Sequence, residues 1–178
     1  MTTWDRDHPW GTTVNTFASV SLRPPLVLVA FDRERRIVPA LRATGRYAVN
    51  ILAEGGQALS DCFAGGPASH VTPGSVLRNR GEMCGAPWRR GSTGLPILDD
   101  AIATLECTVV DTHAAGDHDL FIARVDAAEA IEPAGESSSV ADGDRSAQPM
   151  SLPLLYYSGR YLRIERATSH ELEGKPEH

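Results

Sequence analysis

The segment PWGTTVNTFASVSLRPP, from Pro9 to Pro25, constrains the fold of this chain more than any other part of it. Its central stretch, Thr12 to Leu22, is rich in threonine and valine and contains no glycine, proline or lysine. β-Branched residues favour strands, so we expect a strand over 12–22. The strand should end at Pro24 and Pro25, because proline donates no backbone N–H. Since side chains alternate along a strand, we expect one buried face formed by Val14, Ala18, Val20 and Leu22.

The other face of this predicted strand carries an amide, two hydroxyls and one aromatic ring, from Asn15, Ser19, Ser21 and Phe17. Alternation alone predicts an ordinary amphipathic strand whose polar face meets solvent. The same face can also be offered to a polar, planar ligand. The pattern by itself leaves both interpretations open.

Composition narrows the class of protein. The 178 residues are most simply one domain, and a net charge of −6 argues against a nucleic-acid partner. No apolar run approaches the roughly 20 residues that a membrane span needs. The three cysteines, Cys62, Cys84 and Cys107, have neither a C-x-x-C nor a zinc spacing, so we expect no metal site. Their odd number and the lack of a signal peptide predict a reducing, cytoplasmic location.

Short strands joined by turns dominate the rest of the chain. We expect the apolar run 26–31 to be a strand buried on both faces. Short helices are predicted over 38–44, with Gly45 as the stop, and over 57–64. Further strands are predicted over 1–5 (the end of one), 47–52, 101–113 and 120–127. The fold class is therefore mainly β, a β-barrel with short helices.

Two segments fall outside this pattern. Residues 133–151 are polar and rich in serine and glycine, which predicts a flexible insertion. Residues 167–178 form a polar, acidic stretch that we expect to be a disordered tail. The folded domain is therefore expected over 1–166.

Three arginines, Arg33, Arg35 and Arg36, stand between a predicted strand and the start of a predicted helix. Unpaired N–H groups and the helix dipole favour an anion at such a position, so this loop is a candidate phosphate site. A solvated charged loop is the alternative.

Motifs for other chemistries are missing from the sequence. It contains no G-x-G-x-x-G after a strand, no G-x-x-x-x-G-K-[ST], no H-E-x-x-H and no G-x-S-x-G. Any chemistry would then come from a borrowed organic cofactor.

The string TVNTFASVSLRPPLVLVAFD, over 13–32, resembles the signature of the short-chain flavin reductase family, the reductase components of two-component flavin-dependent monooxygenases. Three further matches support this resemblance: L-S-x-x-F-A at 59–64, G-D-H at 116–118 and L-L-Y-x-x-G-x-Y at 154–161. The resemblance covers roughly 10–65 and 85–165 and implies an FMN-binding split β-barrel. The family's N-terminus is usually longer, so we expect either part of a barrel edge to be missing or the true start to lie upstream.

Residue roles follow from the resemblance. It makes His118, in G-D-H, the residue that orients hydride transfer. The loop at 33–36 is matched by position only, since the family's Ser/Thr pattern is absent there. The expected flavin-binding residues are Thr13, Val14, Asn15, Thr16, Phe17, Ser19, Ser21, Arg33, Arg35, Arg36, Phe63 and Tyr157.

The resemblance also implies a function: an NAD(P)H:flavin oxidoreductase that transfers hydride from NADH or NADPH to FMN or FAD. Reduced flavin would reach a partner monooxygenase by diffusion, and the reductase would be a homodimer. Two rivals stay open, a non-catalytic flavin-binding or sensing barrel and a same-fold flavoprotein that reduces ferric iron or a cobalamin. The sequence does not choose between the two flavins, between the two nicotinamides, or between flavin as substrate and as tightly bound cofactor. It does not name the partner oxygenase.

Overall fold

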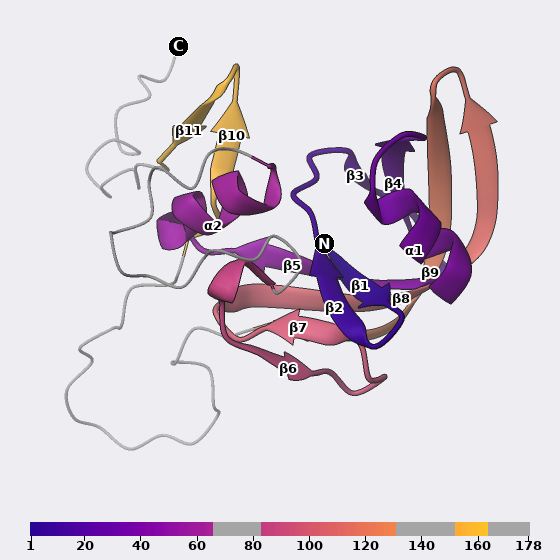
Figure 1. Ribbon diagram of the computed structural model, residues 1–178, viewed down its shortest axis with the longest axis horizontal. Coiled ribbons are helices and arrows are strands. Elements are labelled where there is room, and N and C mark those ends of the chain that lie inside the picture. The colour runs from indigo at the N-terminus through magenta and orange to yellow at the C-terminus, as the bar shows by residue number, and fades with distance from the viewer. Residues whose placement is uncertain (66–82, 131–151, 164–178) are drawn as a thin grey trace, which may run out of the picture.

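One antiparallel sheet of seven strands organises the molecule (Figure 1). The computed structural model describes residues 1–65, 83–130 and 152–163. The strand order is β2-β1-β5-β8-β9-β4-β3. The strands are β1 (Thr2–Asp5), β2 (His8–Gly11), β3 (Phe17–Leu22), β4 (Pro25–Asp32), β5 (Arg46–Leu52), β8 (Ala101–Ala115) and β9 (His118–Ala130). The expected mainly β fold is confirmed.

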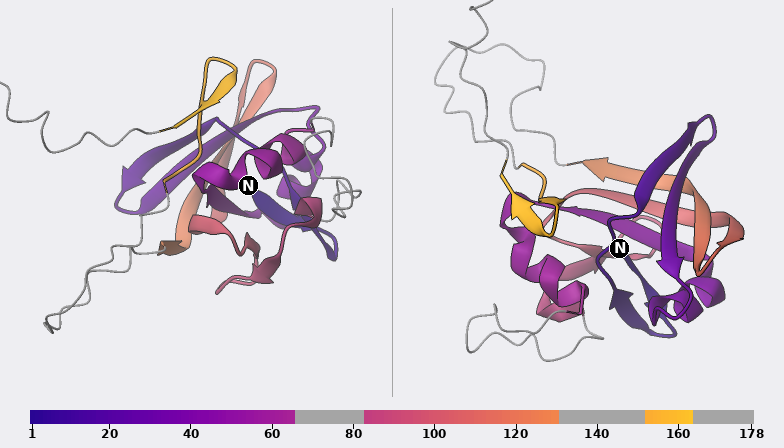
Figure 2. Two further views of the ribbon diagram at one scale, coloured as in Figure 1. Left: turned by 90° about the vertical axis from the view of Figure 1, so that its left-hand side faces the viewer. Right: turned by 90° about the horizontal axis from the view of Figure 1, so that it is seen from above.

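Smaller elements flank the sheet. The hairpin of β6 (Trp88–Arg90) and β7 (Pro96–Leu98) and the hairpin of β10 (Leu155–Tyr157) and β11 (Arg160–Leu162) are separate two-stranded sheets. The helices are α1 (Ile37–Thr44) and α2 (Gln57–Phe63), with 3₁₀ turns η1 (Glu54–Gly56) and η3 (Met83–Gly85). Figures 1 and 2 place α2 beside the β10–β11 hairpin and α1 at the far end of the sheet.

The first predicted strand is shorter than expected. Strand β3 begins at Phe17, because the segment before it leaves the sheet to bond α2: the Thr13 N–H donates to the carbonyl of Phe63 at 3.3 Å. The predicted buried face is wrong within β3, although Val14, before the strand, is half-buried and packs against the core. Val20 is 50% exposed and Leu22 is 88% exposed. A register shift between Ser19 and Ser21 interrupts the alternation, as a β-bulge does.

Most other elements are where the sequence predicts them. Helix α1 ends at Gly45, whose φ of 62° is left-handed and whose N–H donates to the Leu41 carbonyl at 2.8 Å. Strands β8 and β9 extend beyond their predicted ends and pair around the turn at Gly116. Strand β4 differs from expectation, since Val27, Val29 and Phe31 are buried while the residues between them are only half-buried.

The main core lies between α1 and the sheet. Tyr47, Leu41, Val29 and Phe121 are completely or almost completely buried within it. The free thiol of Cys107 is also there, and burial raises its pKa to about 12. The Tyr47 hydroxyl has no hydrogen-bond partner among the described residues.

Cys62 and Cys84 form a disulfide, with their Cα atoms 6.3 Å apart. Their spacing of 22 residues gave no sign of this bridge, because the fold, and not the sequence, brings α2 and η3 together. A bridge between them also differs from what we expect of a chain in a reducing compartment.

The predicted insertion over 133–151 and the predicted tail over 167–178 lie outside the described residues. Within the described parts of the chain, no helix is long and apolar enough to cross a membrane.

Candidate active site

A cavity of about 470 Å³ lies between the 12–17 segment, strand β5, helix α2 and the β10–β11 hairpin. Six of the predicted site residues line it: Thr13, Val14, Asn15, Phe17, Arg35 and Phe63. The sequence signature at 13–17 therefore forms one wall of the cavity, although most of it is loop and not strand. Other lining residues include Val49, Asn50, Ile51, Ser60, Asp61, Leu98, Leu154, Tyr156 and Tyr161.

Helix α2 fixes the signature segment in place. The hydroxyl of Thr13 donates to the carbonyl of Ser60 at 2.6 Å, and its N–H donates to the carbonyl of Phe63. Gly11 allows the close approach, since a Cβ there would lie 2.4 Å from Cε1 of the Phe63 ring. Asn15 is exposed and makes no side-chain hydrogen bond within the described residues. Its amide is therefore free to bond a ligand.

The floor of the cavity carries a buried amide. Asn50, in β5, donates from Nδ2 to the Thr2 hydroxyl at 3.0 Å, and its Oδ1 accepts from the Leu98 N–H at 2.9 Å. Because these two bonds fix the orientation of its amide, Asn50 is a rigid polar part of the cavity lining. Asn50 was not among the predicted site residues, although an asparagine within the apolar run YAVNIL was a visible signal.

Tyrosines of the C-terminal hairpin form the rim. The Tyr161 hydroxyl donates to Asp61 Oδ1 at 2.6 Å, and its ring meets that of Tyr156 edge-on at 5.2 Å. Burial and the hydrogen bond to Asp61 raise the pKa of Tyr161. The predicted Tyr157 is 72% exposed and lies outside the cavity, because alternation turns it away from the side that Tyr156 faces.

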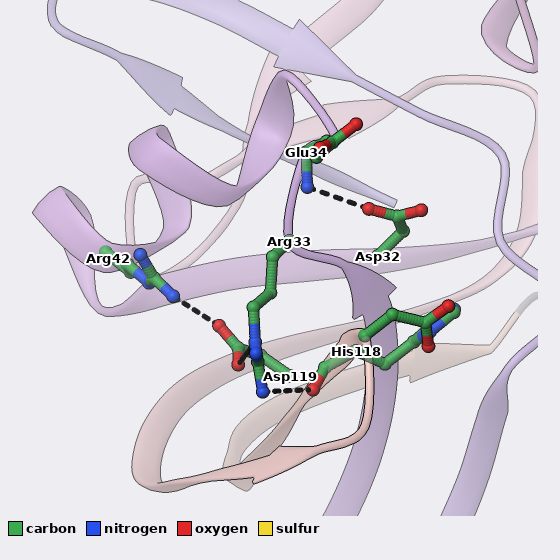
Figure 3. A network of polar contacts seen from close by, with 7 residues as sticks. Asp32, Arg33, Glu34, Arg42, His118 and Asp119 are labelled. Atoms are coloured by element: carbon green, nitrogen blue, oxygen red, sulfur yellow. Dashed lines mark hydrogen bonds and ion pairs between the residues drawn. The ribbon is translucent and has the colours of Figure 1, made fainter.

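The three arginines of the predicted phosphate loop are in different environments. A second cavity of about 210 Å³ adjoins the first, and Arg35 lines both of them. Arg36 lines the smaller cavity, with its guanidinium carbon 5.1 Å from the centre of the Trp10 ring. Arg33 points elsewhere: its Nε donates to Asp119 Oδ1 at 2.9 Å (Figure 3).

Asp119 joins that loop to α1 and β9. Arg42 of α1 bonds its second carboxylate oxygen, so two guanidinium groups share one carboxylate (Figure 3). The hydrogen bonds from Arg33 and Arg42 lower the pKa of Asp119. Arg33 is thus a structural cation of the loop, and Arg35 and Arg36 are the arginines available to an anion.

His118 begins β9, directly after the turn at Gly116. Its Nδ1 lies 2.7 Å from Asp117 Oδ1, and this hydrogen bond lowers the pKa of Asp117. The Asp117 carbonyl accepts from the Arg33 N–H at 3.1 Å, so the hairpin turn contacts the loop of residues 33–36, called the arginine loop below. His118 does not line either cavity within the described part of the chain.

The remaining predicted residues, Thr16, Ser19 and Ser21, lie along β3 or just before it. The Thr16 hydroxyl donates to the carbonyl of Ala30 at 2.7 Å and accepts from its N–H at 3.3 Å, which ties β3 to β4. Ser21 Oγ accepts from the Arg23 N–H at 3.2 Å. None of the three lines either cavity.

The chemistry of the lining decides what the site can do. Among the described residues no group of three or more His, Cys, Asp or Glu could hold a metal ion. The lining of the larger cavity combines apolar side chains and rings with an unpaired amide, and a guanidinium stands at its boundary with the smaller cavity. This arrangement suits a flat heterocycle that carries a phosphate, which is the chemistry of a flavin nucleotide.

Comparison with known proteins agrees with this geometry. The sequence matches the family described as "Flavin reductase like domain" over residues 1–165. It is 35% identical over 161 residues to an NADH-dependent flavin reductase of Rhodococcus sp, covering 90% of this chain and 73% of that protein. It is 32% identical over 165 residues to the reductase subunit HsaB of a flavin-dependent monooxygenase of Mycobacterium tuberculosis, covering 93% of this chain and 74% of HsaB.

Solved structures share the fold. The flavin reductase PheA2 superposes with a TM-score of 0.71 at 31% identity, covering 93% of this chain and 87% of PheA2. An FMN-binding protein from Thermus thermophilus superposes with a TM-score of 0.70 at 27% identity, covering 94% of this chain and 85% of that protein.

Proposed function

This chain belongs to the flavin reductase-like domain family, and on that premise we propose that it is an NAD(P)H-dependent flavin reductase acting on FMN or FAD. The observation that carries the proposal is the larger cavity. It is walled by the family's signature segment at 13–17 and bounded by Arg35, which among the described arginines is the one that lines both cavities. Relatives named NADH-dependent flavin reductase and FMN reductase (NADH) support the same reaction class.

The chain's own residues hold and orient the flavin. The amide of Asn15 and the backbone of 13–17 bond the edge of the heterocycle, and the rings of Phe17 and Phe63 contact its apolar part. Arg35 and Arg36 bind the phosphate before the start of α1. When bound, the flavin supplies the hydride acceptor, its N5, for the hydride that leaves C4 of the nicotinamide.

The protein must therefore bring two flat rings together and exclude water, and needs neither a nucleophile nor a metal. The tyrosine rim limits access from the side of α2, because Tyr161 is held by Asp61. His118, at the hairpin turn that contacts the loop at 33–36, orients the hydride donor. Flavin contacts are also predicted for Thr16, Ser19, Ser21, Arg33 and Tyr157. These stay predictions, and flavin titration of their alanine variants tests them.

The reduced flavin passes from this protein to a second enzyme. Relatives named as reductase components of monooxygenases, among them HsaB, support a flavin-dependent monooxygenase as the partner that consumes it. Transfer by free diffusion, assembly as a homodimer and a cytoplasmic location complete the proposal. The exposed Val20 and Leu22 on the edge strand β3 support pairing of two chains.

The decisive experiment measures NADH and NADPH oxidation under air with FMN, FAD and riboflavin in turn. We expect NADH oxidation that depends on added flavin and consumes oxygen. A chain that binds FMN without oxidising either nicotinamide would be a binding or sensing protein. A chain that purifies with flavin bound and passes electrons only to ferric iron or a cobalamin would also refute the assignment.

A further inference from the structure

The disulfide between Cys62 and Cys84 lies at the wall of the proposed flavin site. Cys62 belongs to α2, the helix whose Ser60, Asp61 and Phe63 line the larger cavity. Cys62 itself lines the adjoining smaller cavity together with Arg35. The bridge is therefore attached to the element that holds the signature segment.

Helix α2 is short, and both packing and hydrogen bonds hold it: Leu59 and Phe63 pack against the cluster that contains Met83. Its carbonyls at Ser60 and Phe63 accept hydrogen bonds from Thr13, and Asp61 accepts one from Tyr161. These hydrogen bonds join α2 to residues that line the larger cavity. The disulfide adds a covalent link, which joins the C-terminal turn of α2 to η3.

The η3 turn has a strained backbone. Met83 and Cys84 both have positive φ, 52° and 55°, which costs energy for residues other than glycine. Met83 is nevertheless buried, in a cluster with Leu98 and Ala101 against which Phe63 packs. Such a strained turn persists only while its surroundings hold it, and the bridge to Cys62 is one of the bonds that do so.

We infer that Cys62 and Cys84 form a reversible oxidation site for hydrogen peroxide, and that its state sets how tightly the flavin site binds. The inference rests on the proposed function, because free reduced flavin reacts with O₂ to give oxidised flavin and H₂O₂. One thiolate attacks the peroxide, gaining an S–O bond as the O–O bond breaks, and water leaves after protonation. The second thiol then attacks the sulfur of this sulfenic acid, the S–S bond forms and a second water leaves. A dithiol reductant restores the two thiols by thiol–disulfide exchange and becomes a disulfide itself.

The oxidised and reduced states differ in the freedom of α2. With the bridge closed, a covalent link fixes the helix in addition to its packing and hydrogen bonds, and the cavity is formed before flavin arrives. With two free thiols, the link to η3 is lost and flavin must order α2 as it binds, which weakens affinity. Peroxide from wasted reduced flavin would therefore make the protein retain flavin and slow its release, a local feedback on the uncoupled reaction.

The test uses the full chain, FMN, hydrogen peroxide and dithiothreitol. Free thiols are counted by alkylation and mass spectrometry, and the Kd for FMN is measured by quenching of flavin fluorescence. We expect dithiothreitol to free both thiols and to raise the Kd at least about fivefold, and peroxide to reverse both changes. Cys107→Ala is the matched control and should respond like the unaltered chain.

The double variant Cys62→Ser/Cys84→Ser should bind FMN as weakly as the reduced chain and ignore both reagents. If it fails to fold, the reduced unaltered chain provides the same comparison. Equal FMN affinity in the two states overturns the inference, and so does a pair of thiols that peroxide leaves free. Both results can occur in a chain that still oxidises NADH with FMN, so they are distinct from failure of the proposed reductase function.

Discussion

At the scale of single residues, His118 is the side chain whose role is best separated from flavin binding. It lies outside both cavities, at a turn that contacts the arginine loop through the Asp117 carbonyl. We predict that His118→Ala lowers the kcat of NADH oxidation by roughly tenfold or more, because the hydride donor loses its orientation. The Kd for FMN should stay within about twofold, since hydride orientation and flavin affinity are separate terms.

Stopped-flow measurement at saturating FMN checks this prediction. His113→Ala is the control, because His113 lies on the same hairpin and also pairs with an aspartate, Asp111. Unchanged turnover in His118→Ala would rule out the orienting role.

Asp119 is the residue whose negative charge should contribute to the stability of the fold. It is almost fully buried and bonds both Arg33 and Arg42. Asp119→Asn should lower the Tm at pH 7, because two guanidinium groups lose their shared carboxylate. The hydrogen bonds from the arginines lower the pKa of Asp119 in the folded state. Its stabilisation is therefore present above the unfolded pKa of about 3.9 and is lost as pH falls below it.

Thermal unfolding between pH 3 and pH 7 tests this. The difference in Tm between the unaltered chain and Asp119→Asn should shrink toward the acid end. Glu129→Gln serves as the control, since the Arg89–Glu129 pair is exposed and such pairs contribute little. A difference in Tm that grows toward low pH would contradict the sign of the pKa shift.

Sequence and structure agree best at residues within or next to the family's motifs. The signature at 13–17, Arg35 and Phe63 were all predicted as site residues from the chain alone, and all but Thr16 line the larger cavity. The hydrogen bond between Asp61 and Tyr161 spans 100 residues of sequence. The sequence pattern of neither segment predicts this bond. Arg33 was predicted to bind phosphate, but its partner Asp119 is also remote in the chain.

At the scale of elements, β3 shows why alternation misleads at a sheet edge. The pattern over 12–22 is regular, but the edge strand tolerates a bulge because only one neighbour, β4, constrains its register. Both faces of β3 are largely exposed on either side of the bulge between Ser19 and Ser21, so the residues predicted to be buried there are not. Strand β5, which has a neighbour on each side, starts one residue before its predicted start and ends at its predicted end, whereas the central strands β8 and β9 extend beyond their predicted ends.

The β6–β7 hairpin depends on one carboxylate from another strand. Glu106 of β8 is 2% exposed, and it accepts hydrogen bonds from the Ser92 hydroxyl at 2.9 Å and the Thr93 N–H at 3.0 Å. Burial alone would raise its pKa, but these bonds and that of the Thr93 hydroxyl lower it. Glu106→Gln should cost about 1–3 kcal/mol in the free energy of unfolding, because the amide donates where the hairpin also donates.

Urea unfolding measures this cost. The conservative control Glu34→Gln changes a carboxylate that is exposed on a loop and should leave the free energy of unfolding within about 0.5 kcal/mol. An equally small effect of Glu106→Gln would show that the hairpin does not need the charge.

Strand β2 and helix α2 can lie in contact because Gly11 has no side chain. A Cβ on Gly11 would lie 2.4 Å from Cε1 of Phe63, so Gly11→Ala must push the ring into the larger cavity or move α2. We expect a cost of about 1–3 kcal/mol in stability and a several-fold rise in the Kd for FMN. Gly55→Ala is the control, because a Cβ there meets nothing within 4 Å. Normal FMN affinity in a stably folded Gly11→Ala variant would separate Phe63 from the flavin site.

At the scale of the whole molecule, the sheet leaves an apolar edge uncovered. Val20 and Leu22 are exposed on β3, which has no strand beyond it within the described chain. An uncovered apolar edge invites pairing with another chain, and the net charge of −6 keeps such pairing from being indiscriminate. The sequence could suggest a dimer only through family resemblance, because it predicted these two side chains to be buried.

Replacing Leu22 by glutamate tests whether that edge joins two chains. We expect the unaltered chain to have the mass of a dimer by light scattering, and Leu22→Glu to shift toward the mass of one chain, because burying an unpaired carboxylate in an apolar interface is costly. His8→Glu is the matched control, since it adds the same charge to β2, the opposite edge strand. A dimer that survives Leu22→Glu with unchanged dissociation constant would place the interface elsewhere, and a monomeric unaltered chain would refute the dimer itself.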